Sequence, residues 1–263
     1  MTHKALLPAI LAMAACSTPP GPGGTGRWVD LTHAFSERTL YWPTSEQFRL
    51  EKVFEGTTPQ GFHYAANRFS AAEHGGTHLD APIHFAAGGA TVDRMVPDQL
   101  IGPAVVIDLS ARTLADRDYR IGIADLVGWE AVHGPIPAQS IVLLRTGYEH
   151  FWPDPVRYLG TAERGAGAVA KLHFPGLAPE AAEWLAAERH IKAVGLDTAS
   201  IDHGQSTLFE SHRILARRGI PIFENVAGLG ELPATGAIVY ALPMKIQGGS
   251  GAPLRVVAWV PSH

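Results

Sequence analysis

The chain has 263 residues, of which 46% are hydrophobic and 17% are charged, and its formal net charge is −4. This balance is typical of a folded globular protein and excludes a disordered one, and the length suits one domain with a sizeable core. The net negative charge offers no basic surface for nucleic acid, so nucleic acid is not an expected partner. With a single cysteine, the chain forms no intrachain disulfide.

The N-terminal residues resemble an export signal. A short positive region, 1–4, precedes an apolar run, 5–15, that is too short to span a bilayer. Cys16 follows small residues as in the lipobox of bacterial lipoproteins, and an ordinary secretory signal is the alternative. We therefore expect a signal peptide over 1–15, a lipidated Cys16 with a flexible tether over 16–26, and a folded domain over 27–263. The protein is then exported to the periplasmic side and anchored by lipid to a bacterial membrane.

The first part of the domain is expected to be rich in strands. Short strands are predicted at 28–31, 48–54 and 62–70, where apolar and aromatic residues recur. A short helical turn at 93–100 precedes a continuous apolar run at 104–109, which is typical of a central strand buried on both faces.

Two aromatic residues stand beside a proline in Tyr41-Trp42-Pro43, within an otherwise polar stretch. Aromatic rings next to a loop are candidate platforms for a substrate, and Trp42 is the residue that we single out for this role. A structural role in closing the core is the alternative.

The second part of the domain alternates strands with helices. Helices are predicted at 123–133, 179–189 and 206–218, strands at 140–145, 192–197, 220–226, 237–241 and 254–260, and a loop-rich stretch at 152–172. Strands separated by helices indicate an α/β fold, here a single domain with a mixed sheet.

The stretch between residues 74 and 85 carries three histidines and an aspartate at even positions: His74, His78, Asp80 and His84. Side chains of an extended chain alternate between faces, so a strand here presents all four on one side. A helix would turn Asp80 away from His78, and the glycines and the proline within the stretch disfavour one. Imidazole and carboxylate groups together suit Zn, Mn or Fe(II). Solvated loop histidines, or core histidines bonded to carbonyl groups, are the alternative.

Two further polar residues fall on apolar faces. His212 lies on the expected helical stripe of Leu208, His212 and Leu215, and Glu224 shares a strand face with Ile222 and Val226. A buried unpaired carboxylate is costly, so Glu224 is expected to be paired, protonated or bound to a metal. A core histidine bonded to a carbonyl group and a glutamate paired with an arginine are the alternatives. Together with His74, His78 and Asp80, these two residues suffice for two metals if Asp80 and Glu224 bridge them.

The segment from His74 to Phe85 resembles the H-x-G-T-H-x-D-x-P-x-H-F signature of the cyclase-like metal-dependent hydrolases. Bacterial kynurenine formamidase and isatin hydrolase belong to that family. Residues 197–202, and His212 followed twelve residues later by Glu224, match further, and the resemblance runs from about residue 28 to residue 260. It implies a swivelling β/β/α fold and assembly into a homodimer or a larger homo-oligomer.

The resemblance also implies a role for each site residue. His74, His78 and Asp80 would bind one metal, and Asp80 would also reach a second metal held by His212, with Glu224 shared. His84 would be the acid/base residue beside the metals, and Trp42 would line the substrate pocket. The expected cofactor is a divalent metal, Zn or Mn, with two ions per subunit.

These residues predict hydrolysis of a C–N amide bond by a metal-activated water, with His84 moving the proton. The sequence has no G-x-S-x-G motif, and Cys16 lies outside the fold, so covalent catalysis has little support. An isatin-like cyclic amide is the predicted substrate, because export conflicts with the cytoplasmic degradation of tryptophan. The alternatives are an arylformamidase acting on N-formylkynurenine and a non-catalytic surface lipoprotein that binds a metal or ligand, which would have no use for His84.

Overall fold

A computed structural model describes residues 24–262 of the chain. The predicted signal peptide and Cys16 lie outside these residues. The first strand, β1 (Gly26–Asp30), begins at the last residue of the predicted tether. Among the described residues, no helix combines the length and apolar character that crossing a membrane requires.

Eight strands form one sheet in the order β1-β12-β11-β5-β7-β9-β10-β4. The strands after β1 are β4 (His78–Asp80), β5 (Ile101–Asp108), β7 (Ile141–Arg145), β9 (Ala193–Leu196), β10 (Ile222–Glu224), β11 (Ile238–Pro243) and β12 (Gly251–Pro261). Neighbours within the run β5-β7-β9-β10 are parallel, and the remaining pairs are antiparallel. The predicted α/β fold with a mixed sheet is confirmed.

The short strand β4 closes this sheet on itself. It pairs with β10 on one side and with the first residues of β12 on the other, while the rest of β12 pairs with β11 and β1. The closed part encloses an apolar core to which β4 contributes Leu79, β10 contributes Phe223 and β12 contributes Leu254. Because strand residues alternate between faces, the neighbours of Leu79 and Phe223 lie on the outer face of this barrel.

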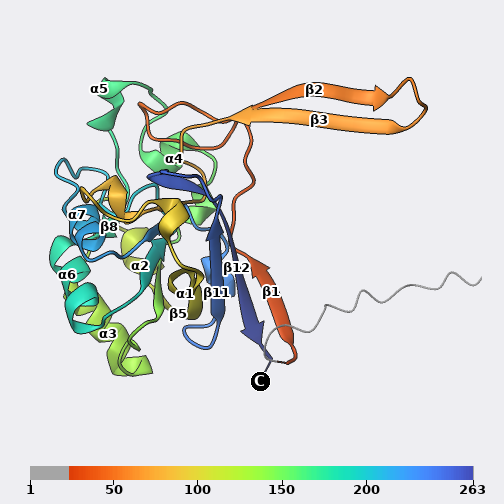
Figure 1. Cartoon of the computed structure of the whole chain (residues 1–263). Helices are drawn as coiled ribbons and strands as arrows, with labels where there is room; N and C mark the ends of the chain where they lie inside the picture. The colour runs from red at the N-terminus through yellow and green to blue at the C-terminus, as the bar shows by residue number, and fades with distance from the viewer. Residues whose placement is uncertain (1–23, 263) are drawn as a thin grey trace, which may run out of the picture.

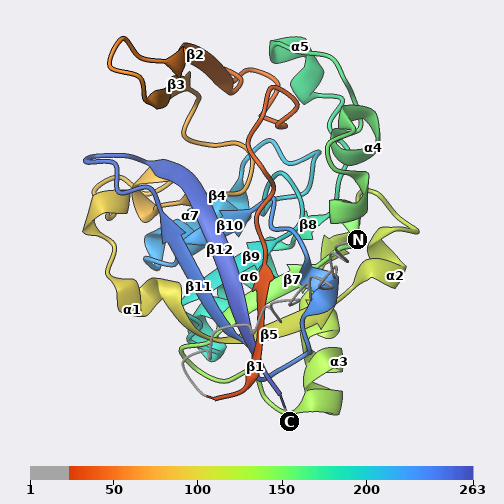
Figure 2. The same ribbon diagram turned by 90° about the vertical axis from the view of Figure 1, so that its right-hand side faces the viewer.

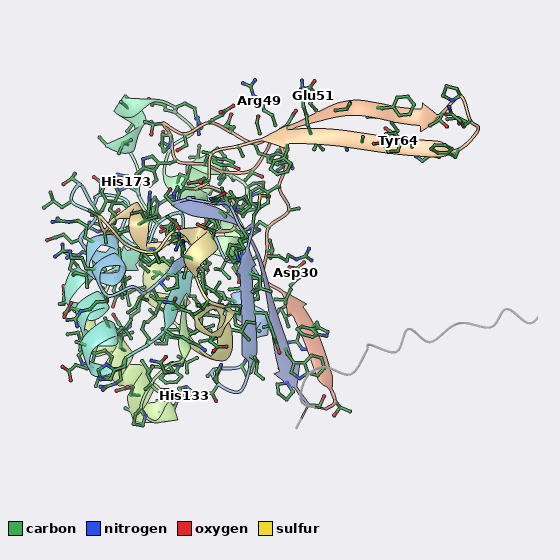
Figure 3. The ribbon with its side chains drawn as sticks, in the orientation of Figure 1. Asp30, Arg49, Glu51, Tyr64, His133 and His173 are labelled. Atoms are coloured by element: carbon green, nitrogen blue, oxygen red, sulfur yellow. The ribbon has the colours of Figure 1, made fainter. Side chains whose placement is uncertain are left out.

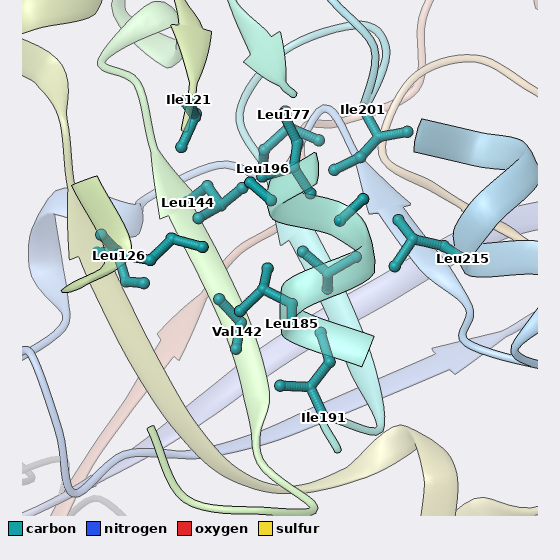
Figure 4. Close-up of a cluster of buried hydrophobic side chains, with 14 of the residues drawn as sticks. Ile121, Leu126, Val142, Leu144, Leu177, Leu185, Ile191, Leu196, Ile201 and Leu215 are labelled. Carbon is teal, nitrogen blue, oxygen red and sulfur yellow. The ribbon is translucent and has the colours of Figure 1, made fainter. Parts of the chain in front are cut away.

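A second apolar core lies between the parallel strands and three helices, α3 (Ile123–His133), α6 (Pro179–Glu188) and α7 (Glu210–Arg217). The helices lie together along one side of the molecule (Figure 1). Figure 4 shows Leu126, Leu185 and Leu215 from these helices in one cluster with Val142 and Leu144 of β7. Each fully buried leucine or valine contributes on the order of 2 kcal/mol. Strand β5 has Val106 in the barrel and Val105 in the helical layer, so the predicted burial of both its faces is confirmed.

Shorter elements connect these layers. They are η1 (Pro82–His84), η2 (Val92–Arg94), α1 (Pro97–Leu100), α2 (Ser110–Thr113), β6 (Arg120–Ile121), η3 (Tyr148–Phe151), α4 (Pro155–Leu159), α5 (Ala166–Val169), β8 (Gly176–Leu177) and η4 (Leu229–Glu231). The prediction of a loop-rich stretch at 152–172 missed α4 and α5.

The helix predicted over 206–218 begins only at Glu210. Phe209 has a left-handed conformation with φ of 48°, so the right-handed helix cannot extend to residues before Glu210. Leu208 therefore lies outside the helix and is 61% exposed, so its assignment to the apolar stripe was wrong. His212 and Leu215 are buried, as predicted.

The strands predicted at 48–54 and 62–70 form β2 (Arg49–Thr57) and β3 (His63–Ser70), an antiparallel pair that does not join the sheet. We call this β2–β3 hairpin the arm. It projects away from the body in both ribbon views, with Tyr64 near its far end (Figures 1, 2 and 3). Large apolar side chains on it are exposed to solvent: Leu50, Val53, Phe54, Phe62, Tyr64 and Phe69.

Candidate metal centre

The pairing of β4 with β10 places three polar side chains on one patch outside the barrel. His78 lies directly opposite Glu224, and Asp80 lies opposite Ile222. Because Leu79 and Phe223 belong to the barrel core, strand alternation turns His78, Asp80 and Glu224 to the outer face. Helix α7 brings His212 to the same patch.

His74 reaches the patch from the segment that precedes β4. Its Nδ1 atom lies 2.6 Å from Asp80 Oδ1. The approach requires a glycine at position 251 on β12, because a Cβ there would lie 2.4 Å from the His74 ring. Gly76 turns the chain between His74 and His78 with φ of 58°, a conformation that glycine adopts readily.

The prediction of one extended segment running to residue 84 was wrong beyond Asp80. Pro82 begins the 3₁₀ helix η1, because its ring fixes φ and suits the first position of a helical turn. His84 lies at the end of η1, and its ring stacks on that of His74 with centroids 3.8 Å apart. All four residues of the even-position array therefore meet, although only His78 and Asp80 belong to a strand.

The nitrogen and oxygen atoms of the patch lie within reach of a common ion. His78 Nε2 is 3.2 Å from Asp80 Oδ1 and 3.5 Å from Glu224 Oε2, and His212 Nε2 is 3.2 Å from Asp80 Oδ2 and 3.1 Å from Glu224 Oε1. Two groups have ligand atoms within 4.8 Å of one another. One is His74, His78 and Asp80, and the other is Asp80, His212 and Glu224. Asp80 belongs to both groups.

In two of the histidines, a hydrogen bond from Nδ1 leaves the lone pair of Nε2 directed toward the patch. His78 Nδ1–H donates to the Gly76 carbonyl at 2.9 Å, and His212 Nδ1–H donates to Asp202 Oδ2 at 2.6 Å. Each bond leaves Nε2 free to bind a metal, because a ring nitrogen that donates a proton cannot also be a ligand.

His74 is oriented the other way round. Its Nε2–H donates to Ser250 Oγ at 2.9 Å, and Ser250 in turn donates to Glu73 Oε2 at 2.7 Å. His74 Nδ1, which contacts Asp80 Oδ1 at 2.6 Å, would then be the ligand atom for a metal. Three imidazole nitrogens and two carboxylates are a donor set that fits a divalent ion such as Zn or Mn.

The electrostatics of the patch also favour a cation. Burial lowers the pKa of His212, but hydrogen bonds to Asp202, Asp80 and Glu224 outweigh it and raise that pKa well above its ordinary value. Burial and the charge of Asp80 raise the pKa of the Glu224 carboxyl. Burial would also raise the pKa of the Asp80 carboxyl, but the charge of His74 and hydrogen bonds from three histidines of the patch outweigh it and hold that pKa well below its ordinary value. The ionised Asp80 at the centre of the patch favours a cation there.

Beside the patch is a cavity of about 250 Å³. All the site residues that we predicted line it: Trp42, His74, His78, Asp80, His84, His212 and Glu224. Phe85 and Phe209 also line it, with their ring centroids 5.5 Å apart, and Trp42 lies 6.1 Å from Phe209. Ligand pockets commonly combine such apolar rings with a few polar groups.

His84 is half-buried in this cavity, between the His74 ring and the ring of Phe85. Burial lowers the pKa of the His84 imidazole to about 4. The ring is therefore neutral at pH 7 and has a lone pair with which to accept a proton.

Sequence reasoning missed several residues that complete the site. Asp202 lies in the segment 197–202 that matched the family, yet its role behind His212 depends on a contact that the sequence does not reveal. Phe85 belongs to the signature itself, but Phe209 lies just before α7, where no periodic pattern marks it. Ser250 contacts His74 and Glu73 only because β12 pairs with β4.

The chain is similar to several known proteins. The sequence profile of the Cyclase family matches residues 29–203. Isatin hydrolase from Roseibium aggregatum is 35% identical over 221 residues, which cover 81% of each chain. Kynurenine formamidase from Paracidovorax citrulli is 32% identical over 225 residues, 80% of this chain and 91% of that protein. The structure of isatin hydrolase A from Ralstonia solanacearum superposes with a TM-score of 0.80 at 35% identity, covering 89% of this chain and 92% of the other.

Proposed function

Because the chain belongs to the Cyclase family of metal-dependent hydrolases, we propose that it breaks the C–N bond of a cyclic amide of the isatin type. The observation that carries this proposal is the position of Asp80, whose buried carboxylate contacts His74, His78 and His212. Similarity to isatin hydrolases in both sequence and structure supports the choice of substrate.

We propose that the centre binds two divalent ions, Zn or Mn, with His74 and His78 on one, His212 on the other, and Asp80 and Glu224 shared. The two overlapping groups of ligand atoms support two positions. A divalent ion bound here would polarise the amide carbonyl and lower the pKa of a bound water.

His84 is the proposed acid/base residue. Its neutral ring would take a proton from the water that adds to the carbonyl carbon, and would return a proton to the nitrogen as the C–N bond breaks. One water is consumed, and the ring opens to a carboxylate and an amine. The position of His84 in the cavity, stacked on a metal-binding histidine, supports this role.

The aromatic rings around the cavity are proposed to hold a planar substrate. Trp42 lines the cavity from the loop before the arm, and Phe209 lines it from the residue before α7. The ring of Phe85 is close to both Phe209 and His212. Stacking on such rings favours flat, aromatic amides over aliphatic ones.

An aryl formamide is the second candidate substrate, supported by the similarity to kynurenine formamidase. The test is a metal analysis of the purified chain, followed by a hydrolysis screen of isatin, N-formylkynurenine and simple lactams with and without a chelator. We expect chelator-sensitive opening of isatin at the highest kcat/KM. Faster turnover of N-formylkynurenine would favour the formamidase, and no turnover of any amide by the metal-loaded chain would contradict both.

We also propose a homodimer in which the arm packs on a second copy. A two-stranded hairpin is only marginally stable in water by itself, and Phe54 and Tyr64, with ring centroids 5.8 Å apart, are exposed on it. The charged side chains of the arm carry both signs, as in the Arg68–Glu51 pair, which suits contact between identical copies.

Export with a lipid anchor on Cys16 is likewise proposed, on the resemblance of residues 1–16 to a lipoprotein signal. Mass spectrometry of the mature N-terminus tests it. A lipid-modified Cys16 as the first residue is expected, and an unprocessed Met1 would contradict export.

A further inference from the structure

Asn225, the residue that follows Glu224, is buried and adopts a left-handed conformation with φ of 53°. Apart from glycine, asparagine is among the residues that tolerate this conformation best. Its backbone N–H donates to the Thr198 carbonyl at 2.9 Å, and its own carbonyl accepts the Thr77 hydroxyl at 2.6 Å. The residue therefore ties the end of β10 to the segment that leads into β4.

The side chain of Asn225 reaches the carbonyl group that orients His78. Asn225 Nδ2 donates to the Gly76 carbonyl oxygen at 2.8 Å, and the same oxygen accepts His78 Nδ1–H at 2.9 Å. The backbone of Gly76 has little freedom to adjust, because a Cβ at this position would lie 2.7 Å from the Phe35 ring. Two donors thus converge on one carbonyl whose direction is set by close packing.

The orientation of the Asn225 amide follows from its partners. The Gly76 carbonyl can only accept, so the nitrogen of the amide must face it and the oxygen must face the other way. That oxygen lies 2.9 Å from the hydroxyl of Tyr158, which is fully buried. The Tyr158 hydroxyl has a second possible acceptor, the Asp197 carbonyl at 3.0 Å, but within residues 24–262 this hydroxyl is the only donor to the amide oxygen. Tyr158 therefore holds the amide in place.

We propose that Asn225, held by Tyr158, is a positioning residue that sets the metal affinity of the centre through the Gly76 carbonyl and His78. The chain of contacts runs from the tyrosine hydroxyl through the amide and the carbonyl to His78 Nδ1–H, which leaves His78 Nε2 as the free ligand atom. Such outer hydrogen-bond partners typically change metal affinity by about 10- to 100-fold. This inference rests on the proposed function, because it requires that the centre binds a metal.

The variant Asn225→Gly separates positioning from folding. Glycine suits a φ of 53°, so the backbone turn is kept while the amide is lost. The full chain is stripped of metal, and the affinity for Zn²⁺ or Mn²⁺ alone is measured by competition with a chelator. We expect the Kd for the ion held by His74, His78 and Asp80 to rise by about 10- to 100-fold. An unchanged Kd would overturn the inference.

Tyr158→Phe gives a second measurement, since it removes only the hydroxyl that orients the amide. A rise in Kd in the same direction, smaller than that of Asn225→Gly, is expected. The matched control is Thr113→Val, which removes a buried hydroxyl that donates to the Leu109 and Thr146 carbonyls. The Tm of the metal-free chain falls in both variants, but only Tyr158→Phe weakens metal binding.

Equal Kd values for Tyr158→Phe, Thr113→Val and the wild-type chain would show that Tyr158 is merely structural and would overturn its part in the proposal. A wild-type chain that takes up no Zn²⁺ or Mn²⁺ would overturn the proposed function, and this inference with it. A wild-type chain and an Asn225→Gly variant that bind metal equally well would overturn the inference alone.

Discussion

The metal centre and the arm depart from the usual rule of apolar residues inside and polar residues outside, in opposite directions. In the centre, His78, Asp80, His212 and Glu224 are each at most 4% exposed. On the arm, Val53 is 60% and Phe62 is 57% exposed. The buried charges contact one another and suit a cation, so their burial is compensated within one chain. Nothing in the described part of the chain covers the exposed apolar side chains of the arm, which is why we propose a second copy as their partner.

Removing the carboxylate that both ligand groups share should have the largest effect. In Asp80→Asn, the amide carries no charge to balance a divalent ion, so we expect metal content to fall and kcat/KM for the cyclic amide to drop by about 10³-fold or more. Metal analysis and steady-state kinetics measure both. The matched control is Asp98→Asn, an exposed aspartate on α1. A metal content and a rate like those of the wild type would contradict the role of Asp80.

The next test separates binding from proton transfer within the same cavity. His84→Ala should keep the metal content and lower kcat by about 10²- to 10³-fold, because the ring that moves the proton is lost. His133→Ala, on the exposed face of α3 (Figure 3), is the control for loss of a histidine. Undiminished turnover by metal-loaded His84→Ala would rule out the acid/base role.

The arm is tested by replacing its exposed rings. The double variant Phe54→Ser and Tyr64→Ser should weaken dimerisation by about 100-fold, since buried aromatic anchors commonly contribute 2 kcal/mol or more to an interface. Analytical ultracentrifugation over a range of concentrations measures the dimer Kd. Lys52→Ser, on the same strand, is the control for a polar change. If the wild-type chain stays monomeric at micromolar concentration, a second copy is not the partner of the arm.

The smallest expected effect concerns His33, which stacks on Trp152 and does not line the cavity of the metal centre. Burial lowers the pKa of its imidazole to about 4, and its Nε2 atom has no hydrogen-bond partner among the residues that the structure describes. The His33 imidazole therefore binds a proton less readily in the folded chain than in the unfolded chain. Its contribution to stability is complete above pH 6.5 and is lost as the pH falls toward 4.

Between pH 7 and pH 4.5, we expect protonation of His33 to lower the free energy of unfolding by about 2 kcal/mol. Urea unfolding of the metal-free chain at pH 7 and pH 4.5 measures it. His33→Phe keeps the stacked ring and should reduce the pH dependence by that amount, whereas His150→Phe, at an exposed position, should leave it unchanged. An equal pH dependence in His33→Phe and the wild type would contradict the assignment.

Much of the site could be predicted because its residues break local patterns. His212 on the inner face of an amphipathic helix, and Glu224 between apolar strand neighbours, stand out in the sequence itself. The even spacing of His74, His78 and Asp80 indicated a shared face, and the cavity that they line with His84 agrees with that grouping. Their individual roles stay predictions until metal binding and turnover are measured.

Other features depend on contacts between distant parts of the chain, which local patterns do not encode. The alternation in β2 and β3 predicts strands correctly, but it does not show that they pair only with each other and leave the sheet. The turn into η1 at Pro82 and the left-handed Phe209 shift element ends away from the periodic pattern. The roles of Asp202 and Asn225 depend on contacts across the fold. Asp202 accepts a hydrogen bond from His212, and Asn225 donates one to the Gly76 carbonyl.

The most direct test of the central claim is removal and return of the metal while the opening of isatin is followed. The metal-free wild-type chain should lose activity by about 10³-fold and regain it on addition of Mn²⁺ or Zn²⁺, with up to two ions bound per subunit. Full activity in the chain shown by analysis to contain no metal would contradict the account, since His84 and the aromatic rings alone would then suffice.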